Sequence, residues 1–231
     1  PHRFAISLRC NVTAESAPDI PEFIDLLAEL GLQDSVNRVY FAPIHSWGND
    51  AQELSLDRAT FAAHEIGWMA QLLRLGFDVG SLPEPKPIVC MATSKSAELV
   101  DAFGEVFNCT EVSYVPTYGT PNRYALGTLD DGVEDERRQL LGNFNDRVEA
   151  GEVPCRSCRM LPVCGGSCPK AWLDGETPCP SFKWHLGTRL LLELGRHRQA
   201  VTVADRPVEV PSVAEVLARI ELSGDEPEVP A

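Results

Sequence analysis

Apolar residues in the first 80 positions fall alternately into short runs and into helical spacing. The run 4–9 (FAISLR) predicts a short strand, and the apolar positions of 20–30 recur at the spacing of one helix face. The run 39–44 predicts a second strand, buried on both faces, and 55–75 predicts a second helix. Strand, helix, strand, helix is the order of βα units on a parallel sheet, as in α/β barrels and doubly wound folds. We expect an α/β fold in which these residues form part of a partial (β/α) barrel.

A different pattern begins near residue 81, where the chain becomes rich in proline, glycine and cysteine. Short helices are expected there over 94–103 and 134–150, and a longer apolar helix over 184–197. The last residues are rich in proline and acid, with a short helical run at 213–220. These breaks predict four parts: the barrel units (1–80), a cysteine-rich domain (81–182), a C-terminal helix (183–203) and an acidic tail (204–231).

Composition narrows the class of partner. The 231 residues carry 34 acidic and 20 basic side chains, a net charge of -14, which repels phosphate backbones and anionic lipid surfaces. Neither nucleic acid nor a membrane is expected as a partner. No apolar stretch is long enough to span a bilayer and no signal-peptide pattern is found, so a cytoplasmic location is expected. Because a buried strand is predicted almost at Pro1, we expect the chain to be the C-terminal part of a longer protein.

The eight cysteines are too sparse for a disulfide-stapled scaffold and are better interpreted as thiolate ligands. Four of them occupy a stretch of fourteen residues, with two, five and three residues between them. Ten further residues separate the last of these four from another cysteine. They are Cys155, Cys158, Cys164, Cys168 and Cys179. Soft thiolates bind zinc or iron in tetrahedral geometry, and CxxC turns let two sulfurs reach one metal.

Glycines and basic residues near these cysteines fit a metal site. Gly165 and Gly166 lack a Cβ, so backbone N–H groups can approach sulfur there. Arg156, Arg159 and Lys170 would offset the negative charge of a cluster.

Structural zinc and an iron-sulfur cluster fit the spacing of these cysteines about equally, whereas disulfides and unligated buried thiols fit it poorly. A second thiol pair lies upstream, where thirteen residues separate Cys90 from Gly104 and four more separate Gly104 from Cys109. Seven thiols suit two clusters better than one zinc.

This pattern of seven cysteines and one glycine resembles the SPASM domain of radical S-adenosylmethionine (radical SAM) enzymes, in which it follows a partial barrel. The resemblance covers Cys90 to Cys179. It implies two auxiliary 4Fe-4S clusters. The first would be held by Cys90, Cys109 and Cys168 and would be one protein ligand short. The second would be held by the remaining four cysteines, Cys155, Cys158, Cys164 and Cys179.

The resemblance also implies an activity for the intact protein. Related enzymes modify ribosomally synthesised peptides, for example by crosslinks or thioethers, and use S-adenosylmethionine, a third 4Fe-4S cluster and a reductant such as flavodoxin or ferredoxin. The CxxxCxxC loop that holds the third cluster is not in these 231 residues, so this chain alone should be inactive. Thr110 after Cys109 stands where the sulfatase-maturing branch has an aspartate, which argues against that chemistry.

Several residues have two interpretations. Arg9 is either a contact to S-adenosylmethionine at a strand end or a surface ion-pair residue. Residues His45, Trp47 and Asn49 either face a substrate or belong to an ordinary loop. Packing is the simpler interpretation for Cys10, and it also applies to Tyr114, Tyr118, Tyr124, Trp172, His185 and His197. For the whole chain the alternative is a non-catalytic iron-sulfur or zinc-binding module for electron transfer or peptide docking.

Overall fold

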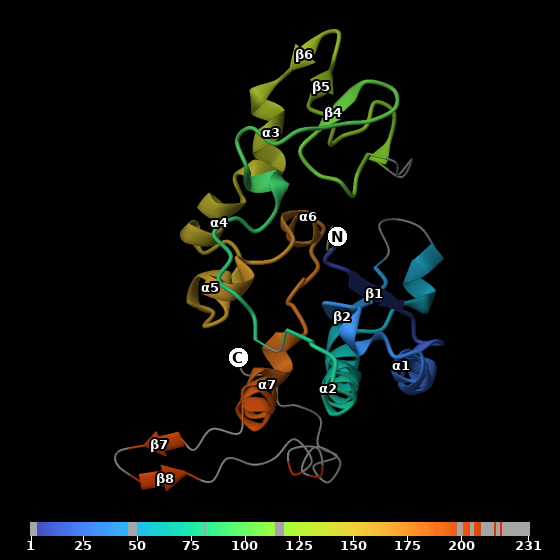
Figure 1. Cartoon of the computed structure of the whole chain (residues 1–231). Coiled ribbons are helices and arrows are strands. Elements are labelled where there is room, and N and C mark those ends of the chain that lie inside the picture. Colours follow the sequence, from blue (N-terminus) through green and yellow to red (C-terminus); the bar gives the residue numbers. More distant parts are fainter. Residues whose placement is uncertain are drawn as a thin grey trace. The chain divides into compact units, whose positions relative to one another are not determined.

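The computed structural model describes residues 4–45, 50–80, 82–113, 118–197, 201–203 and 206–208, together with residues 215 and 218. The chain divides into two compact units (Figure 1). The first, here called the α/β unit, comprises Pro1–His45, Asp50–Pro83 and Ser181–Ala231. The second, the cysteine-rich unit, comprises Ser46–Asn49 and Glu84–Pro180.

The α/β unit contains a pair of parallel strands, β1 (Ser7–Val12) and β2 (Arg38–Pro43), joined through helix α1 (Ile20–Glu29). This confirms the mixed helix and strand class and the predicted parallel βα grammar. Within the described residues the two strands form an open pair and no barrel closes around them.

The strand expected at 4–9 begins three residues later in the structure. It starts at Ser7 because Phe4 and Ile6 are exposed, at 82% and 46% of their surface, and the inward positions are Leu8, Cys10 and Val12. Phe4 and Ile6 would lie on the same face as these three residues, but they precede the ladder with β2, which begins at Ser7 and Arg38.

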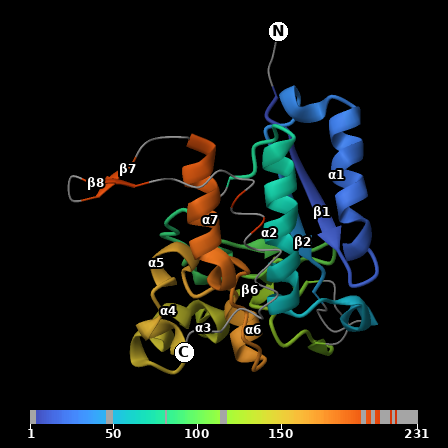
Figure 2. The same cartoon turned by 90° about the horizontal axis from the view of Figure 1, so that it is seen from below.

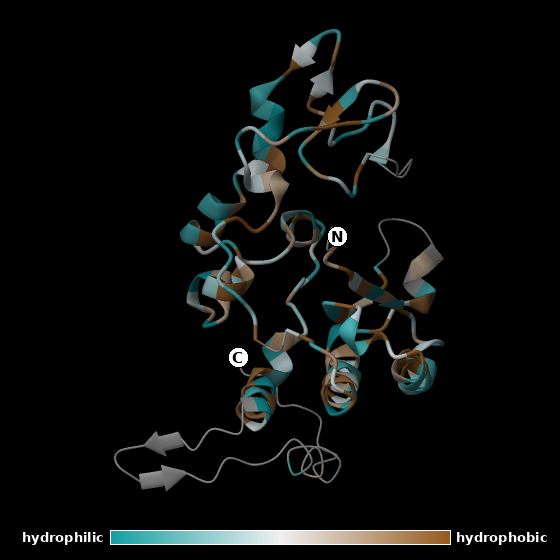
Figure 3. Cartoon of the chain, in the orientation of Figure 1, coloured by the Kyte–Doolittle hydropathy of each residue, from teal (hydrophilic) through white to brown (hydrophobic). Residues whose placement is uncertain are grey.

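Helices α2 (Arg58–Arg74) and α7 (Phe182–His197) complete the unit, with α2 packed between α1 and α7 (Figure 2). Figure 3 shows apolar and hydrophilic residues alternating along these helices, as expected for elements with one face in a core. Asp57 caps α2 by accepting the backbone N–H groups of Ala59 and Thr60. The largest fully buried side chains of the core are Val12, Ile24, Val39, Phe61, Leu72 and Leu192.

A buried polar network links α2 to α7. The Oε2 atom of Glu65 accepts hydrogen bonds from Ser181 Oγ at 2.5 Å, His185 Nε2 at 3.0 Å and Arg189 Nη2 at 2.9 Å. Arg189 Nε donates to His185 Nδ1 at 3.1 Å, which leaves the histidine proton on Nε2, facing Glu65. His185 also has non-helical φ and ψ inside α7, which marks a kink. The packing interpretation of His185 agrees with this position.

The cysteine-rich unit combines a small antiparallel sheet with short helices. The strands pair in chain order. They are β3 (Leu99–Val100), β4 (Glu105–Phe107), β5 (Gly127–Thr128) and β6 (Gly132–Val133). The helices are α3 (Asp135–Gly142), α4 (Phe144–Ala150), α5 (Leu161–Cys164) and α6 (Pro169–Leu173).

The helix expected over 94–103 was wrong, because this segment forms β3 and the turn into β4. Asp101 Oδ1 accepts the backbone N–H groups of Phe103 and Glu105, and Gly104 has a φ of 82°. Both features fix a hairpin turn that a helix would not allow. The helix expected over 134–150 is two helices that meet at Asn143.

Beyond α7 the structure describes only the antiparallel pair β7 (Val201–Val203) and β8 (Arg206–Val208) and two helical positions. Most of the predicted tail and of the run 213–220 therefore lies outside the described residues. Among the helices of the described ranges, none has the length and apolar character needed to cross a bilayer.

Replacing Glu65 with alanine should destabilise the α/β unit by about 3 to 5 kcal/mol, because it leaves the buried Arg189 guanidinium without its carboxylate. Chemical denaturation of the full chain, followed by far-UV circular dichroism, measures this. Glu29→Ala on the exposed face of α1 is the matched control and should change the free energy of unfolding by less than about 0.5 kcal/mol.

The pH dependence of the same measurement has a defined sign. Burial alone would raise the pKa of Glu65, but the bonds from His185, Arg189 and Ser181 outweigh it and lower the pKa. A lowered pKa stabilises the folded state above the unfolded value of about 4.3, and this stabilisation is lost as the pH falls through the folded value. The difference in the free energy of unfolding between wild type and Glu65→Ala should therefore become smaller as the pH falls. A difference that grows in acid would contradict the lowered pKa of Glu65.

Candidate metal centre

The three cysteines assigned to the first cluster come from three separate segments of the cysteine-rich unit. Cys90 precedes a 3-10 turn (Met91–Thr93), Cys109 follows β4, and Cys168 is the N-cap of α6. Cys109 and Cys90 contribute to one hydrophobic core cluster. The pKa of Cys109 is raised to about 11, mainly by burial, and the charges of Cys168 and Cys90 contribute to this rise. Because such effects need proximity, these three thiols, here called the first group, lie within electrostatic reach of one another.

Cys168 accepts hydrogen bonds from two backbone N–H groups at the start of α6. Burial raises the pKa of its thiol, while hydrogen bonds from the N–H groups of Ala171 and Lys170 oppose this rise. The charge on Cys90 raises the pKa, and the Lys170 ammonium lowers it. The start of α6 thus favours the thiolate form of Cys168.

The second group contains Cys155, Cys158, Cys164 and Cys179. The N–H of Cys158 donates to the carbonyl of Cys155 at 3.0 Å and closes the CxxC turn. Burial raises the pKa of Cys164; the N–H of Gly166 opposes this rise, and the charges of Cys158 and Cys179 add to it. Cys155 Sγ lies 3.9 Å from the carbonyl oxygen of Gly166. Cys155 and Cys164 therefore lie beside the Gly166 turn, and Cys158 and Cys179 lie within electrostatic reach of Cys164.

Gly165 and Gly166 shape this turn, as their sequence position suggested. Their φ angles are 64° and 88°. The N–H of Gly166 lies 3.3 Å from Cys164 Sγ, and its carbonyl accepts the indole N–H of Trp172 at 2.8 Å. A Cβ on Gly166 would stand 2.8 Å from Cε1 of Phe144. Only glycine satisfies both the backbone angle and the close approach.

The donor set suits a polynuclear cluster. None of the eight cysteines, all of which lie in the described ranges, forms a disulfide. In the same ranges no group of three or more His, Cys, Asp or Glu side chains is arranged to hold a metal ion. The ligands of a four-iron cluster stand farther apart than those of one zinc, because iron and sulfide lie between them. Seven thiolates are soft ligands of the kind that such clusters use, and positive iron would offset the cost of ionising them in a buried site.

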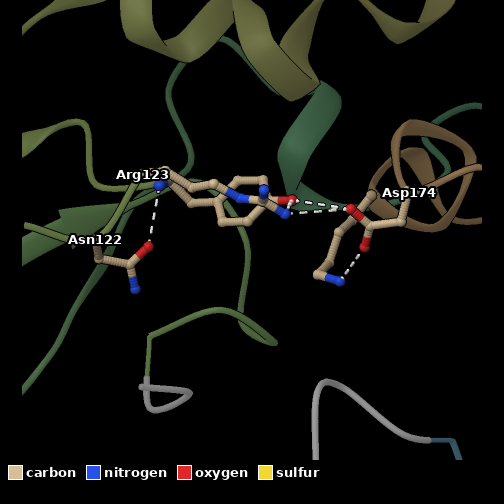
Figure 4. A network of polar contacts seen from close by, with 5 residues as sticks. Asn122, Arg123 and Asp174 are labelled. Carbon is tan, nitrogen blue, oxygen red and sulfur yellow. Dashed lines mark hydrogen bonds and ion pairs between the residues drawn. The ribbon is translucent and has the colours of Figure 1, made fainter. Parts of the chain in front are cut away.

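A polar cluster borders the first group and was missed from the sequence, where its tyrosines were interpreted as packing. It consists of Tyr118, Arg123, Tyr124, Lys170 and Asp174. Figure 4 shows Asp174 facing Arg123, with dashed lines converging on the Asp174 carboxylate. Lys170 Nζ lies 2.5 Å from Asp174 Oδ2, and Tyr124 Oη donates to Asp174 Oδ1 at 3.2 Å. The sequence signal was the i, i+4 pair of Lys170 and Asp174 next to Cys168.

Near the second group lies a pocket of about 400 Å³ with Lys86 and Arg156 among its lining residues and Val148 and Leu161 as apolar walls. Lys86 also lowers the pKa of Cys164. Arg156 and Lys86 are therefore basic residues beside this group.

The other candidate residues belong to the α/β unit or lie outside the described part. Arg9 is exposed in the middle of β1, opposite Tyr40, rather than at a strand end. His45 is exposed just after β2, and Cys10 packs partly buried against the core. Trp47, Asn49 and Tyr114, and the side chain of His197, lie outside the described residues.

Comparison of the chain with protein-family models, with curated proteins and with solved structures finds no match. The interpretation of the site therefore rests on the cysteine pattern and on the local geometry.

Replacing Gly166 with alanine should destabilise the cysteine-rich unit by more than about 2 kcal/mol, since the new Cβ adds backbone strain and a collision with Phe144. Gly175→Ala is the matched control, because Gly175 has a similar φ of 83° but a Cβ added there would meet nothing within 4 Å. Urea unfolding of both variants measures the difference. Equal losses of stability would show that the contact with Phe144 contributes nothing.

Proposed function

We propose that this chain is the auxiliary iron-sulfur region of a radical SAM enzyme with a SPASM domain, which modifies a ribosomally synthesised precursor peptide. One observation carries the proposal. It is the spacing of seven cysteines and one glycine between Cys90 and Cys179. The mutual influence of Cys109 with Cys90 and Cys168, and of Cys164 with Cys158 and Cys179, supports a division into two groups.

In this proposal Cys90, Cys109 and Cys168 hold the first cluster and the second group holds the other. When bound, such clusters accept and pass on single electrons. The residues of this chain supply thiolates, exclude water through burial of Cys109 and Cys155, and direct N–H groups at sulfur from Gly166, Lys170 and Ala171. These contacts stabilise negative charge at the sulfurs and orient the ligands.

The remaining parts of the proposal concern the intact enzyme. The α/β unit would be the end of the partial barrel, with Arg9 as a candidate contact to S-adenosylmethionine. The cleavage of S-adenosylmethionine would take place at a third 4Fe-4S cluster outside this sequence, with electrons from flavodoxin or ferredoxin in the cytoplasm.

A non-catalytic module is the second candidate, holding either iron-sulfur clusters or zinc. The CxxC turn at Cys155 and Cys158 favours it, because this turn is also common in structural zinc sites. Such a module would dock a peptide or carry electrons without chemistry of its own.

Anaerobic reconstitution of the full chain with iron and sulfide should give about eight irons and eight sulfides per chain, as two 4Fe-4S clusters require. Cys168→Ser and Cys155→Ser should each reduce the iron content by about half, since each removes a ligand of a different cluster. Cys10→Ser is the control and should retain the full content. Stoichiometric zinc without sulfide would contradict the cluster assignment.

The peptide-modifying activity has its own test. The intact enzyme, with reductant and the peptide encoded beside it, should release 5'-deoxyadenosine and change the mass of the peptide, whereas this chain alone should do neither. Release by neither protein, with both clusters present, would favour the non-catalytic module.

A further inference from the structure

Lys170 occupies an unusual position for a lysine. Only 4% of the surface of Lys170 is exposed, and the residue lies on α6, two residues after Cys168. Lysine is almost never buried without a specific partner, because removing its charge from water is costly. Asp174, one helical turn further on, supplies that partner as a partly buried ion pair. Lys170 is therefore a buried ammonium ion.

One carboxylate and one aromatic ring, itself packed against a second ring, hold this ammonium in place. Its Nζ atom lies 2.5 Å from Asp174 Oδ2 and 5.0 Å from the centre of the Tyr118 ring. Tyr118 packs edge-on against Tyr124 with ring centres 4.9 Å apart. A lysine packed this way has little freedom to swing into solvent, so its charge stays at a fixed place.

Asp174 is shared with a second cation. Its Oδ1 atom lies 3.4 Å from Arg123 Nη2, and Arg123 also stacks over Tyr124 at 4.8 Å from the ring centre (Figure 4). The side chain of Arg123 is 59% exposed, whereas that of Lys170 is 5% exposed. Solvent screens the arginine much more than the lysine, so the buried Lys170 and Asp174 dominate the local field.

That field acts on the first group. Lys170 follows Cys168 by two residues on α6, and Tyr118, which its ammonium contacts, packs in the same buried cluster as Cys90 and Cys109. The buried charge therefore lies beside the sulfurs of that group and stabilises negative charge there. A surface salt bridge between residues four apart would have no such effect, because it would be solvated.

We propose that Lys170 and Asp174 form an electrostatic pair that sets the reduction potential of the cluster held by Cys90, Cys109 and Cys168. The inference rests on the proposed function, because it requires a cluster at the first group. Reduction adds one electron and one negative charge to the cluster. A fixed cation favours the reduced form and a fixed anion disfavours it. Lys170 therefore raises the potential, and Asp174 moderates this effect.

The two residues should give shifts of opposite sign. In the reconstituted full chain, Lys170→Met should lower the potential of the first cluster and Asp174→Asn should raise it. Lys170→Arg keeps the charge and should stay close to wild type, and the exposed Lys95→Met is the matched control for loss of one positive charge. Redox titration monitored by electron paramagnetic resonance measures the shift. The signal that disappears in Cys168→Ser identifies the first cluster, and the second cluster is the internal reference.

The possible outcomes separate the two proposals. Shifts of opposite sign, confined to the first cluster, support the pair. Equal shifts for Lys170→Met and Lys95→Met, or shifts of the same sign for Lys170→Met and Asp174→Asn, overturn it while the cluster assignment stands. If Lys170→Met does not assemble the cluster, Asp174→Asn decides, because an unchanged or lowered potential there also overturns the pair. A wild-type chain that binds no iron and sulfide overturns the proposed function instead.

Discussion

The cost of ionising buried thiols is the constraint on which the proposed metal centre of the cysteine-rich unit depends. A thiolate is the metal ligand, yet burial disfavours the charged form and each neighbouring thiolate disfavours it further. Cys109 experiences both effects, and burial together with the charges of Cys168 and Cys90 raises its pKa to about 11. In the proposed function, bound iron would supply the positive charge that offsets this cost, and the protein would supplement it.

The short helices and turns of the unit are arranged around that need. α6 begins at Cys168, so its first N–H groups face the sulfur, and it places Lys170 in the interior beside Asp174. The glycine turn directs the N–H of Gly166 at Cys164 in the same way. Little regular sheet is present among the described residues of this unit, because its segments are positioned by these local contacts and by small clusters around Phe107 and Phe144.

Local patterns in the sequence were enough to predict the βα grammar and the glycine turn among the cysteines, whereas the two cysteine groups stay a prediction from the resemblance. Parallel pairing of β1 and β2 followed from apolar runs separated by an amphipathic helix, and the glycines at 165 and 166 were recognised by their place between cysteines. The start of β1 was misplaced because Phe4 and Ile6 are apolar but exposed. The hairpin at Asp101 was missed because its turn depends on a side chain bonding to backbone two and four residues on.

Long-range polar contacts were beyond sequence reasoning. Glu65 meets His185 and Arg189 across more than a hundred residues, and Asp174 meets Arg123 and Tyr124 across about fifty. No helix or strand period relates residues so far apart in the sequence. Charged residues that meet in this way therefore look like surface residues until the fold is known. The burial of Lys170 was missed for a different reason, since its partner Asp174 is local and a lysine with an acidic i+4 partner is usually solvated.

The identity of the metal held by the seven cysteines decides between a cluster protein and a zinc module. X-ray absorption at the iron and zinc edges of the anaerobically purified full chain addresses this without reconstitution. Two bound clusters should give iron with sulfur neighbours and a clear iron–iron scattering contribution, as in other polynuclear sites. Zinc in an all-sulfur shell, with no iron–iron contribution, would contradict the cluster assignment.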